Sequence, residues 1–181
     1  MNRLPDLDAV LEQESARERF RPATRLISVT RERVLDIVGT LARLGLAAVW
    51  LLSGVPKALD PDQTYVAVRA YDVLPPLGVE LVAALLPWME IALAVLVLLG
   101  LGTRAVAVVS ALLLLAFVAG VTQAWVRGLS IDCGCFGGGG AVEPGQTAYL
   151  AELARDTGFL LLAAWLVVRP RTLFAVDTRI G

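Results

Sequence analysis

The sequence contains no histidine, and this absence removes several classes of function. Histidine is a common ligand of catalytic zinc and the usual general base near neutral pH. Haem held by a histidine ligand is excluded for the same reason. Any catalysis in this chain must therefore use other residue types.

Charged residues are scarce, at 18% of the chain, and the net charge of −1 gives no basis for nucleic-acid binding. Eight arginines lie in residues 1–43, whereas the middle of the chain is almost without charge. Hydrophobic residues make up 57% of the chain, against about 45–50% in a typical soluble domain. This segregation predicts a membrane protein with a charged cytoplasmic end.

Four apolar segments are each close to the length that crosses a bilayer, which is roughly 20 residues. They cover residues 37–55, 77–101, 105–126 and 148–168. The second and third are separated by a few residues, so we expect antiparallel neighbours. The sequence predicts an all-α fold, a four-helix transmembrane bundle at 37–168, with a polar N-terminal arm at 1–36 and a tail at 169–181.

Positive charge predicts the orientation, because arginine and lysine accumulate on the cytoplasmic side. The N-terminal arm, Arg104 and the tail are all basic. Both termini should therefore be cytoplasmic, with the loops 56–76 and 127–147 outside. The arm itself predicts two short helices, near residues 6–19 and 24–36, which form either a solvated tail or a segment lying on the membrane surface.

The first outer loop predicts a short helix on the outer membrane surface. Asp60 is a helix N-cap residue and Pro61 suits the first helical position. We expect the helix to end at the prolines 75 and 76. One side of it would be lined by Tyr65, Val66, Val68 and Tyr71.

Both cysteines of the chain lie in one segment, SIDCGCFGGGG, at residues 130–140. A Cys133–Cys135 bridge closes a loop so short that it stabilises by roughly 1.6 kcal/mol, against about 3 for fifteen residues. Strained, exposed disulfides are typically redox-active, and Gly134 makes closure feasible. We therefore predict a redox-active pair on the oxidising outer face. A structural bridge and capture of a soft metal remain alternatives.

Glu90 lies deep in the second apolar segment. A charge there costs about 2.5–3.5 kcal/mol on insertion scales, so it should face the bundle interior. It is a candidate catalytic group that passes protons during thiol oxidation. The alternative is a structural hydrogen bond to Arg43, Ser53 or Ser110.

Other polar and aromatic residues are candidate ligands of a quinone. Lys57 could stabilise a thiolate or a reduced quinone, or extend to the interface. Glu80 is either a solvated carboxylate or shares a face with Glu90. Trp50 and Trp88 are interface anchors or walls of a quinone pocket. The remaining ionisable groups near the outer face are Asp132, whose charge would raise the pKa of a neighbouring thiol, and Glu152, Arg155 and Asp156, which could pair locally or with Lys57 and Glu80.

Three segments resemble the MauE branch of the DoxX-like membrane proteins. RLGLAAVWLLSGVPKALDP looks like the first span of that family, and LLPWMEIALAVLVLLGLGTR looks like its second. DCGCFGG is similar to the most specific signature, between the third and fourth spans. The resemblance covers about residues 38–168.

The resemblance implies disulfide formation in exported proteins, in the inner membrane of a bacterium. By analogy with DsbB and vitamin K epoxide reductase, the chain would oxidise an exported thioredoxin-like or DsbA-like partner and pass electrons to menaquinone or ubiquinone. Those enzymes carry two cysteine pairs and this chain has one. No metal, haem or flavin is expected. Alternatives are an outward reductant relay, a non-enzymatic membrane scaffold or assembly factor, and a soft-metal transporter.

Overall fold

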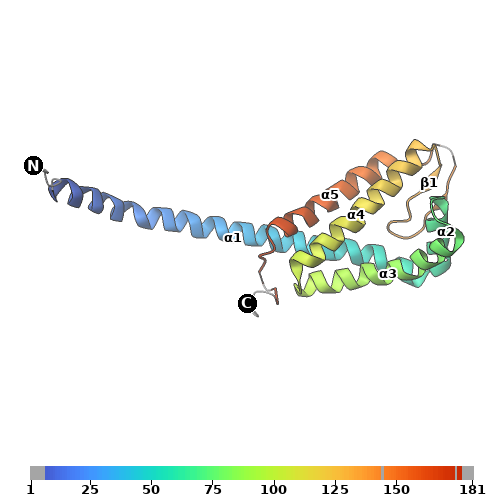
Figure 1. The fold of residues 1–181 in the computed structure, drawn as a ribbon, viewed down its shortest axis with the longest axis horizontal. Coiled ribbons are helices and arrows are strands. Elements are labelled where there is room, and N and C mark those ends of the chain that lie inside the picture. Colours follow the sequence, from blue (N-terminus) through green and yellow to red (C-terminus); the bar gives the residue numbers. More distant parts are fainter. Residues whose placement is uncertain (1–6, 144, 174, 177–181) are drawn as a thin grey trace, which may run out of the picture. The chain divides into compact units, whose positions relative to one another are not determined.

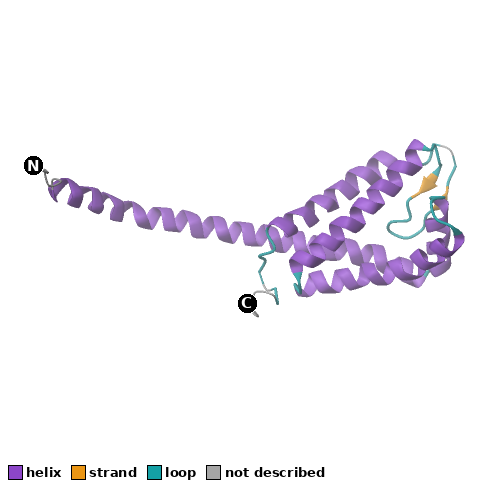
Figure 2. Cartoon of the chain, viewed as in Figure 1, coloured by secondary structure: helices purple, strands orange, loops and turns teal. Residues whose placement is uncertain are grey.

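The computed structural model describes the backbone of residues 7–143, 145–173 and 175–176, and side chains from Val29 onward. These residues form five helices and one two-stranded sheet (Figures 1 and 2). The chain divides into two compact units, Met1–Val38 and Gly39–Gly181. The second unit contains the cysteines and the helices around them.

Helix α1 runs from Leu7 to Leu59 without interruption. The two short helices expected in the N-terminal arm are therefore wrong, because a single helix continues from the arm into the first apolar segment. Val29 and Val34 are exposed. Leu26 and Ile27, which would also face lipid in a surface-lying arm, fall outside the described side chains.

Helices α3, Pro76–Leu99, and α4, Thr103–Val126, form the predicted second and third spans. The turn between them begins at Gly100, whose φ of 68° is in the left-handed region that glycine adopts without strain. Among the described residues, three helical segments are long and apolar enough to cross a membrane: α3, α4 and the Val29–Leu59 part of α1. This is the pattern of a multi-pass membrane protein.

Helix α5, Tyr149–Val168, occupies the fourth apolar segment and lies beside α4 (Figure 1). Its first two turns carry Glu152, Arg155 and Asp156, and it is not among the three candidate spans. A fourth crossing therefore stays a prediction. All four long helices share one core, which includes Leu46 and Trp50 of α1, Ala94 of α3, Ala107 of α4 and Leu166 of α5.

Helix α2, Pro61–Ala70, confirms the short helix predicted after the first span. Asp60 caps it, because its side chain accepts a hydrogen bond from the backbone N–H of Gln63 at 3.0 Å. The buried residues of α2 are Thr64 and Ala67. Of the four residues predicted to line one side, Val66 is exposed and the other three are half-buried. The expected end of the helix is wrong, because the prolines at 75 and 76 begin α3 instead.

The cysteine segment folds into a hairpin, which the all-α prediction did not include. Strand β1, Ile131–Asp132, pairs antiparallel with β2, Gly140–Ala141. The hairpin and α2 lie together at the end of the bundle where α4 ends and α5 begins (Figure 1). The chain after α5 lies at the other end, where Arg43 donates a hydrogen bond to the carbonyl of Leu173.

Candidate redox site

Two glycines fix the hairpin against α2. Gly134, between the cysteines, has a φ of +66°, and Gly139 has a φ of +100°. A Cβ on either residue would lie 2.7 Å from Cβ of Ala67 on α2, which no native packing tolerates. These two glycines therefore let the loop double back and pack against α2 of its own chain.

Cys133 is buried, and two N–H donors of the described residues lie within hydrogen-bond distance of its sulfur. The backbone N–H of Cys135 lies 3.2 Å from Sγ of Cys133, and Nη2 of Arg155 lies 3.5 Å from it. The hydroxyl of Tyr71 donates to the carbonyl of Cys133 at 3.1 Å. Because N–H donors favour the charged form of a thiol, this arrangement stabilises a thiolate on Cys133.

The two thiols have opposite acid–base character. Hydrogen bonding from the Cys135 thiol is the main cause that lowers the pKa of Cys133, with further help from Arg155 and from the backbone N–H of Cys135. The same bond raises the pKa of Cys135, and burial raises it further. No disulfide joins the two cysteines, and in this reduced pair Cys133 loses its proton before Cys135 does.

Arg155 is held in place from two sides. Its Nε lies 3.0 Å from Oδ1 of Asp156, and its guanidinium lies 4.8 Å from the ring centre of Phe136. The local Arg155–Asp156 pair is one of the two predicted pairings, and it is confirmed. The contact between Arg155 and Cys133 supplies the cation that offsets the neighbouring carboxylates.

Two carboxylates lie close to the sulfur of Cys133. The potential ligand atoms of Asp132, Cys133 and Glu152 all lie within 4.8 Å of one another. Such a set has the composition of a small metal site. The guanidinium of Arg155 already lies against the same sulfur, and a divalent cation there would be opposed by its charge.

A buried polar network lies below Cys135, toward the membrane-spanning part of the chain. Nζ of Lys57 lies 2.7 Å from Oε1 of Glu90 and 2.8 Å from Oγ of Ser53. The Ser53 hydroxyl lies 2.9 Å from Glu90 Oε1 and 2.7 Å from the carbonyl of Cys135. Because a hydroxyl has one proton, Ser53 donates to only one of these two oxygens at a time.

The network corrects several expectations about the buried charges. Glu90 faces the interior as predicted, and Ser53 is one of its partners, whereas Lys57 is buried with it rather than extended to the interface. Arg43 instead contacts the chain after α5. Ser110 accepts a hydrogen bond from Trp50 at 3.0 Å.

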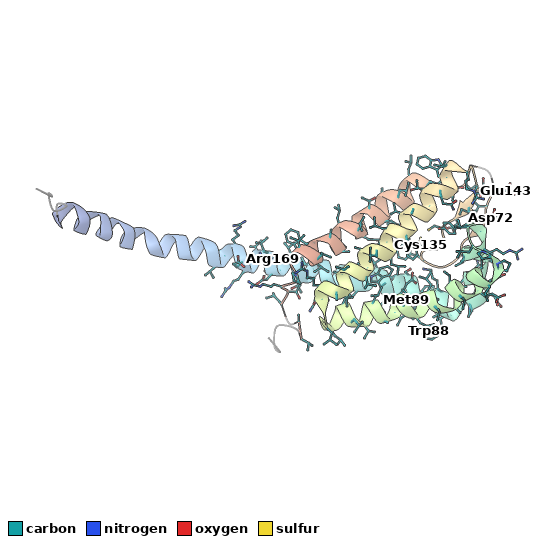
Figure 3. The ribbon with its side chains drawn as sticks, viewed as in Figure 1. Asp72, Trp88, Met89, Cys135, Glu143 and Arg169 are labelled. Carbon is teal, nitrogen blue, oxygen red and sulfur yellow. The ribbon has the colours of Figure 1, made fainter. Side chains whose placement is uncertain are left out.

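The candidate quinone ligands divide into buried and exposed residues. Trp50 is 1% exposed and packs against Phe117, so it is no interface anchor. Trp88 is 64% exposed and points outward from α3 (Figure 3). Glu80 is also exposed and does not share the buried face of Glu90. Of the four candidates, Lys57 and Trp50 are buried, and both contact the ring of Phe117.

Sequence reasoning assigned no role at the cysteines to Arg155 or Tyr71. Tyr71 follows α2 and Arg155 lies in α5, far from the cysteines along the chain. Two signals pointed to Arg155: it is charged at the start of an apolar segment, and it follows the cysteine loop. Tyr71 gave no signal beyond its place in the outer loop.

Comparison with known proteins identifies the family. The model of the methylamine utilisation protein MauE matches residues 35–169. The chain belongs to the MauE family. It is 40% identical over 99 residues to the methylamine utilization protein MauE of Paracoccus denitrificans, covering 54% of this chain and 53% of that protein. It thus spans about half the length of this curated relative, and no solved structure matches it significantly.

The match places the cysteine hairpin inside the family region. Residues 35–169 include α3, α4, the hairpin and the whole of α5. They also include the first candidate span except for its start. The chain is therefore a MauE family membrane protein with a close cysteine pair. Most of the N-terminal arm, residues 1–34, lies outside the match.

Proposed function

We propose that the protein is a membrane thiol–disulfide oxidoreductase that oxidises an exported dithiol protein through Cys133 and Cys135. The observation that carries this proposal is the set of donors on Sγ of Cys133, from Arg155 and from the backbone of Cys135. A structural cysteine pair has no need of a stabilised thiolate. A pair that undergoes thiol–disulfide exchange requires one.

The reaction balances with one cysteine pair. A dithiol partner of thioredoxin-like chemistry transfers two electrons and two protons to the Cys133–Cys135 bridge. Its own two sulfurs become a disulfide, and both cysteines become thiols. A second oxidant must then accept these electrons and protons before the next cycle.

The acceptor we propose is a lipid quinone near the Lys57–Ser53–Glu90 network. Oε2 of Glu90 is buried and has no hydrogen-bond partner among the described residues. This free oxygen, beside the ammonium of Lys57, fits a ligand that exchanges protons. A bound quinone would supply the oxidising power that restores the bridge. Glu90 would hold a proton at Oε2, and Lys57 would keep the carboxyl group in position.

The proposed membrane arrangement makes α5 the fourth span. The apolar second half of α5 packs in the same core as α1, α3 and α4. Four crossings place both termini in the cytoplasm, beside the arginines of the arm and tail, and place the hairpin outside. The location is then the inner membrane of a bacterium, with the cysteines on the oxidising side.

The test uses the full chain in detergent or nanodiscs, with reduced thioredoxin and a short-chain quinone. Wild type should reduce quinone, whereas Cys133→Ser and Cys135→Ser should not. Ser130→Ala, a change in the same loop, is the matched control and should remain active. Thiol exchange without quinone reduction would overturn the quinone acceptor and favour the outward reductant relay.

Absence of any exchange with thioredoxin would overturn the oxidoreductase. In that case the scaffold function would be favoured, especially if both cysteine variants kept the biological function. The name of the Paracoccus relative associates that protein with methylamine utilisation. Our proposal for this chain takes nothing from that name, because it rests on residues of this chain.

A further inference from the structure

The geometry points to a fixed division of roles within the pair: the incoming thiolate attacks Cys135, Cys133 departs as the thiolate, and Arg155 positions and stabilises the departing sulfur. This inference rests on the proposed function and specifies its first chemical step. It assigns Arg155 as a positioning residue that acts through Cys133.

Access to the two sulfurs differs. Cys133 is 9% exposed and belongs to a cluster of buried residues that includes Val121, Ile131 and Tyr149. Cys135 is only half-buried and lies on the hairpin, at the end of the bundle that carries α2 (Figure 3). An attacking thiolate must approach a disulfide sulfur directly, and Cys135 is the more exposed residue of the pair, which favours attack there.

Stabilisation of the departing sulfur also differs. A disulfide opens faster when the departing thiol has the lower pKa. Sγ of Cys133 has the Cys135 backbone N–H at 3.2 Å and Nη2 of Arg155 at 3.5 Å. Neither donor contacts Sγ of Cys135 in the hydrogen bonds of the described residues. Attack on Cys135 therefore releases Sγ of Cys133, the sulfur that already has hydrogen-bond donors beside it.

The other ionisable groups around Cys133 do not reverse this assignment. Asp132 and Glu152 lie close to its sulfur and oppose a negative charge there, while Tyr71 donates to its backbone. Arg155 is the cation that faces the same sulfur. Asp156 fixes the Nε side of Arg155, which leaves Nη2 directed at Cys133.

The attack exchanges one sulfur–sulfur bond for another. The partner thiolate forms a bond to Sγ of Cys135, the Sγ–Sγ bond breaks, and its electron pair goes to Sγ of Cys133. The second partner thiolate then attacks the partner sulfur of this mixed disulfide and releases Cys135, which takes up a proton. The partner is oxidised by two electrons, and the pair is reduced by two.

Glutathione is the probe that locates the attacked sulfur. The oxidised full-length protein in detergent is mixed briefly with glutathione, quenched with acid and blocked with N-ethylmaleimide. Fragmentation mass spectrometry then shows which cysteine carries glutathione and which carries maleimide. We expect glutathione on Cys135 and maleimide on Cys133. The reverse labelling, or an even mixture, would overturn the assignment.

This result is distinguishable from failure of the proposed function. A protein that lacks thiol–disulfide exchange would give no glutathione adduct on either cysteine, and that outcome would overturn the oxidoreductase itself. An adduct on Cys133 would leave the oxidoreductase intact and overturn only the division of roles.

The role of Arg155 is tested with Arg155→Gln, Arg155→Lys and the control Arg127→Gln. Arg127 pairs with Asp72 at the surface of the same end of the protein. Glutathione attack should slow several-fold in Arg155→Gln, recover in part in Arg155→Lys and stay unchanged in Arg127→Gln. A purely structural role would leave the thiolate titration of Cys133 in place. Titration and rate both at wild-type values in Arg155→Gln would overturn the role.

Discussion

The ammonium of Lys57 on α1 lies 2.7 Å from Oε1 of Glu90 on α3, and both side chains are buried. An ion pair inside the apolar part of a membrane protein is expensive to desolvate. Its position directly below the cysteine hairpin, connected through Ser53, ties it to the redox site.

Removal of one partner of this pair should cost more than removal of both. Lys57→Met leaves the Glu90 carboxylate without its cation, and we expect a loss of about 3–5 kcal/mol in the free energy of unfolding. Lys57→Met/Glu90→Leu should recover part of that loss. Unfolding of the detergent-solubilised proteins measures the loss in the single variant and the recovery in the double variant. Additive losses would show that the two side chains do not interact.

Ser53→Ala should impair electron transfer more than exchange with thiols. The change removes the hydroxyl that lies between Cys135, Lys57 and Glu90, at a cost of about 0.5–1.5 kcal/mol per hydrogen bond. We expect quinone reduction to fall by about tenfold, which is equivalent to 1.4 kcal/mol. Glutathione exchange measures the cysteines alone and should change little.

Ser110→Ala is the matched control for Ser53→Ala. It removes a buried hydroxyl of the same bundle, which accepts from Trp50, away from the cysteines. Its quinone reduction should exceed that of Ser53→Ala. Equal losses in the two variants would mean that Ser53 has only a packing role.

Gly134→Ala should disturb the hairpin. The change adds a Cβ at 2.7 Å from Cβ of Ala67, at a φ of +66°. Strained positive φ alone costs on the order of 1–3 kcal/mol. Gly145→Ala has a φ of +90° and open space around it, so it measures strain without the contact. We expect a larger drop in unfolding temperature for Gly134→Ala, with partial recovery in Gly134→Ala/Ala67→Gly.

The reduced cysteines should titrate in two widely separated steps. The pKa of Cys133 is lowered and that of Cys135 is raised. An ordinary thiol has a pKa of about 8.5. The first rise in thiolate absorbance should therefore come below that pH and reach one equivalent before the second rise begins. Arg155→Gln removes a cation and should move the first step to higher pH. A single step of two equivalents near the ordinary value would contradict this.

The sequence predicted the long apolar helices α3, α4 and α5 well because apolar length and proline or glycine boundaries are local signals, while a fourth membrane crossing stays a prediction. The helix after Asp60 and the turn at Gly100 were recognised for the same reason. The end of α2 was not recognised from the sequence, because prolines such as Pro75 and Pro76 occur at the start of a helix as well as after its end.

The partners of the cysteines could not be predicted, because they depend on tertiary contacts. Arg155 and Tyr71 reach Cys133 from different helical regions. The burial of Glu90 followed from the cost of a charge in an apolar segment. The choice of Lys57 over Arg43 depended on the depth and rotation of α1, which composition does not determine.

The single proton of the Ser53 hydroxyl connects two equilibria. If oxidation of the cysteine pair moves the Cys135 carbonyl, it changes whether the Ser53 hydroxyl donates to that carbonyl or to Glu90. The proton affinity of Glu90 then changes as well. Thermodynamic reciprocity then requires that protonation of Glu90 shifts the reduction potential of the cysteines by the same free energy. One serine would thus make the electron affinity of an outer loop depend on the proton occupancy of a site inside the membrane.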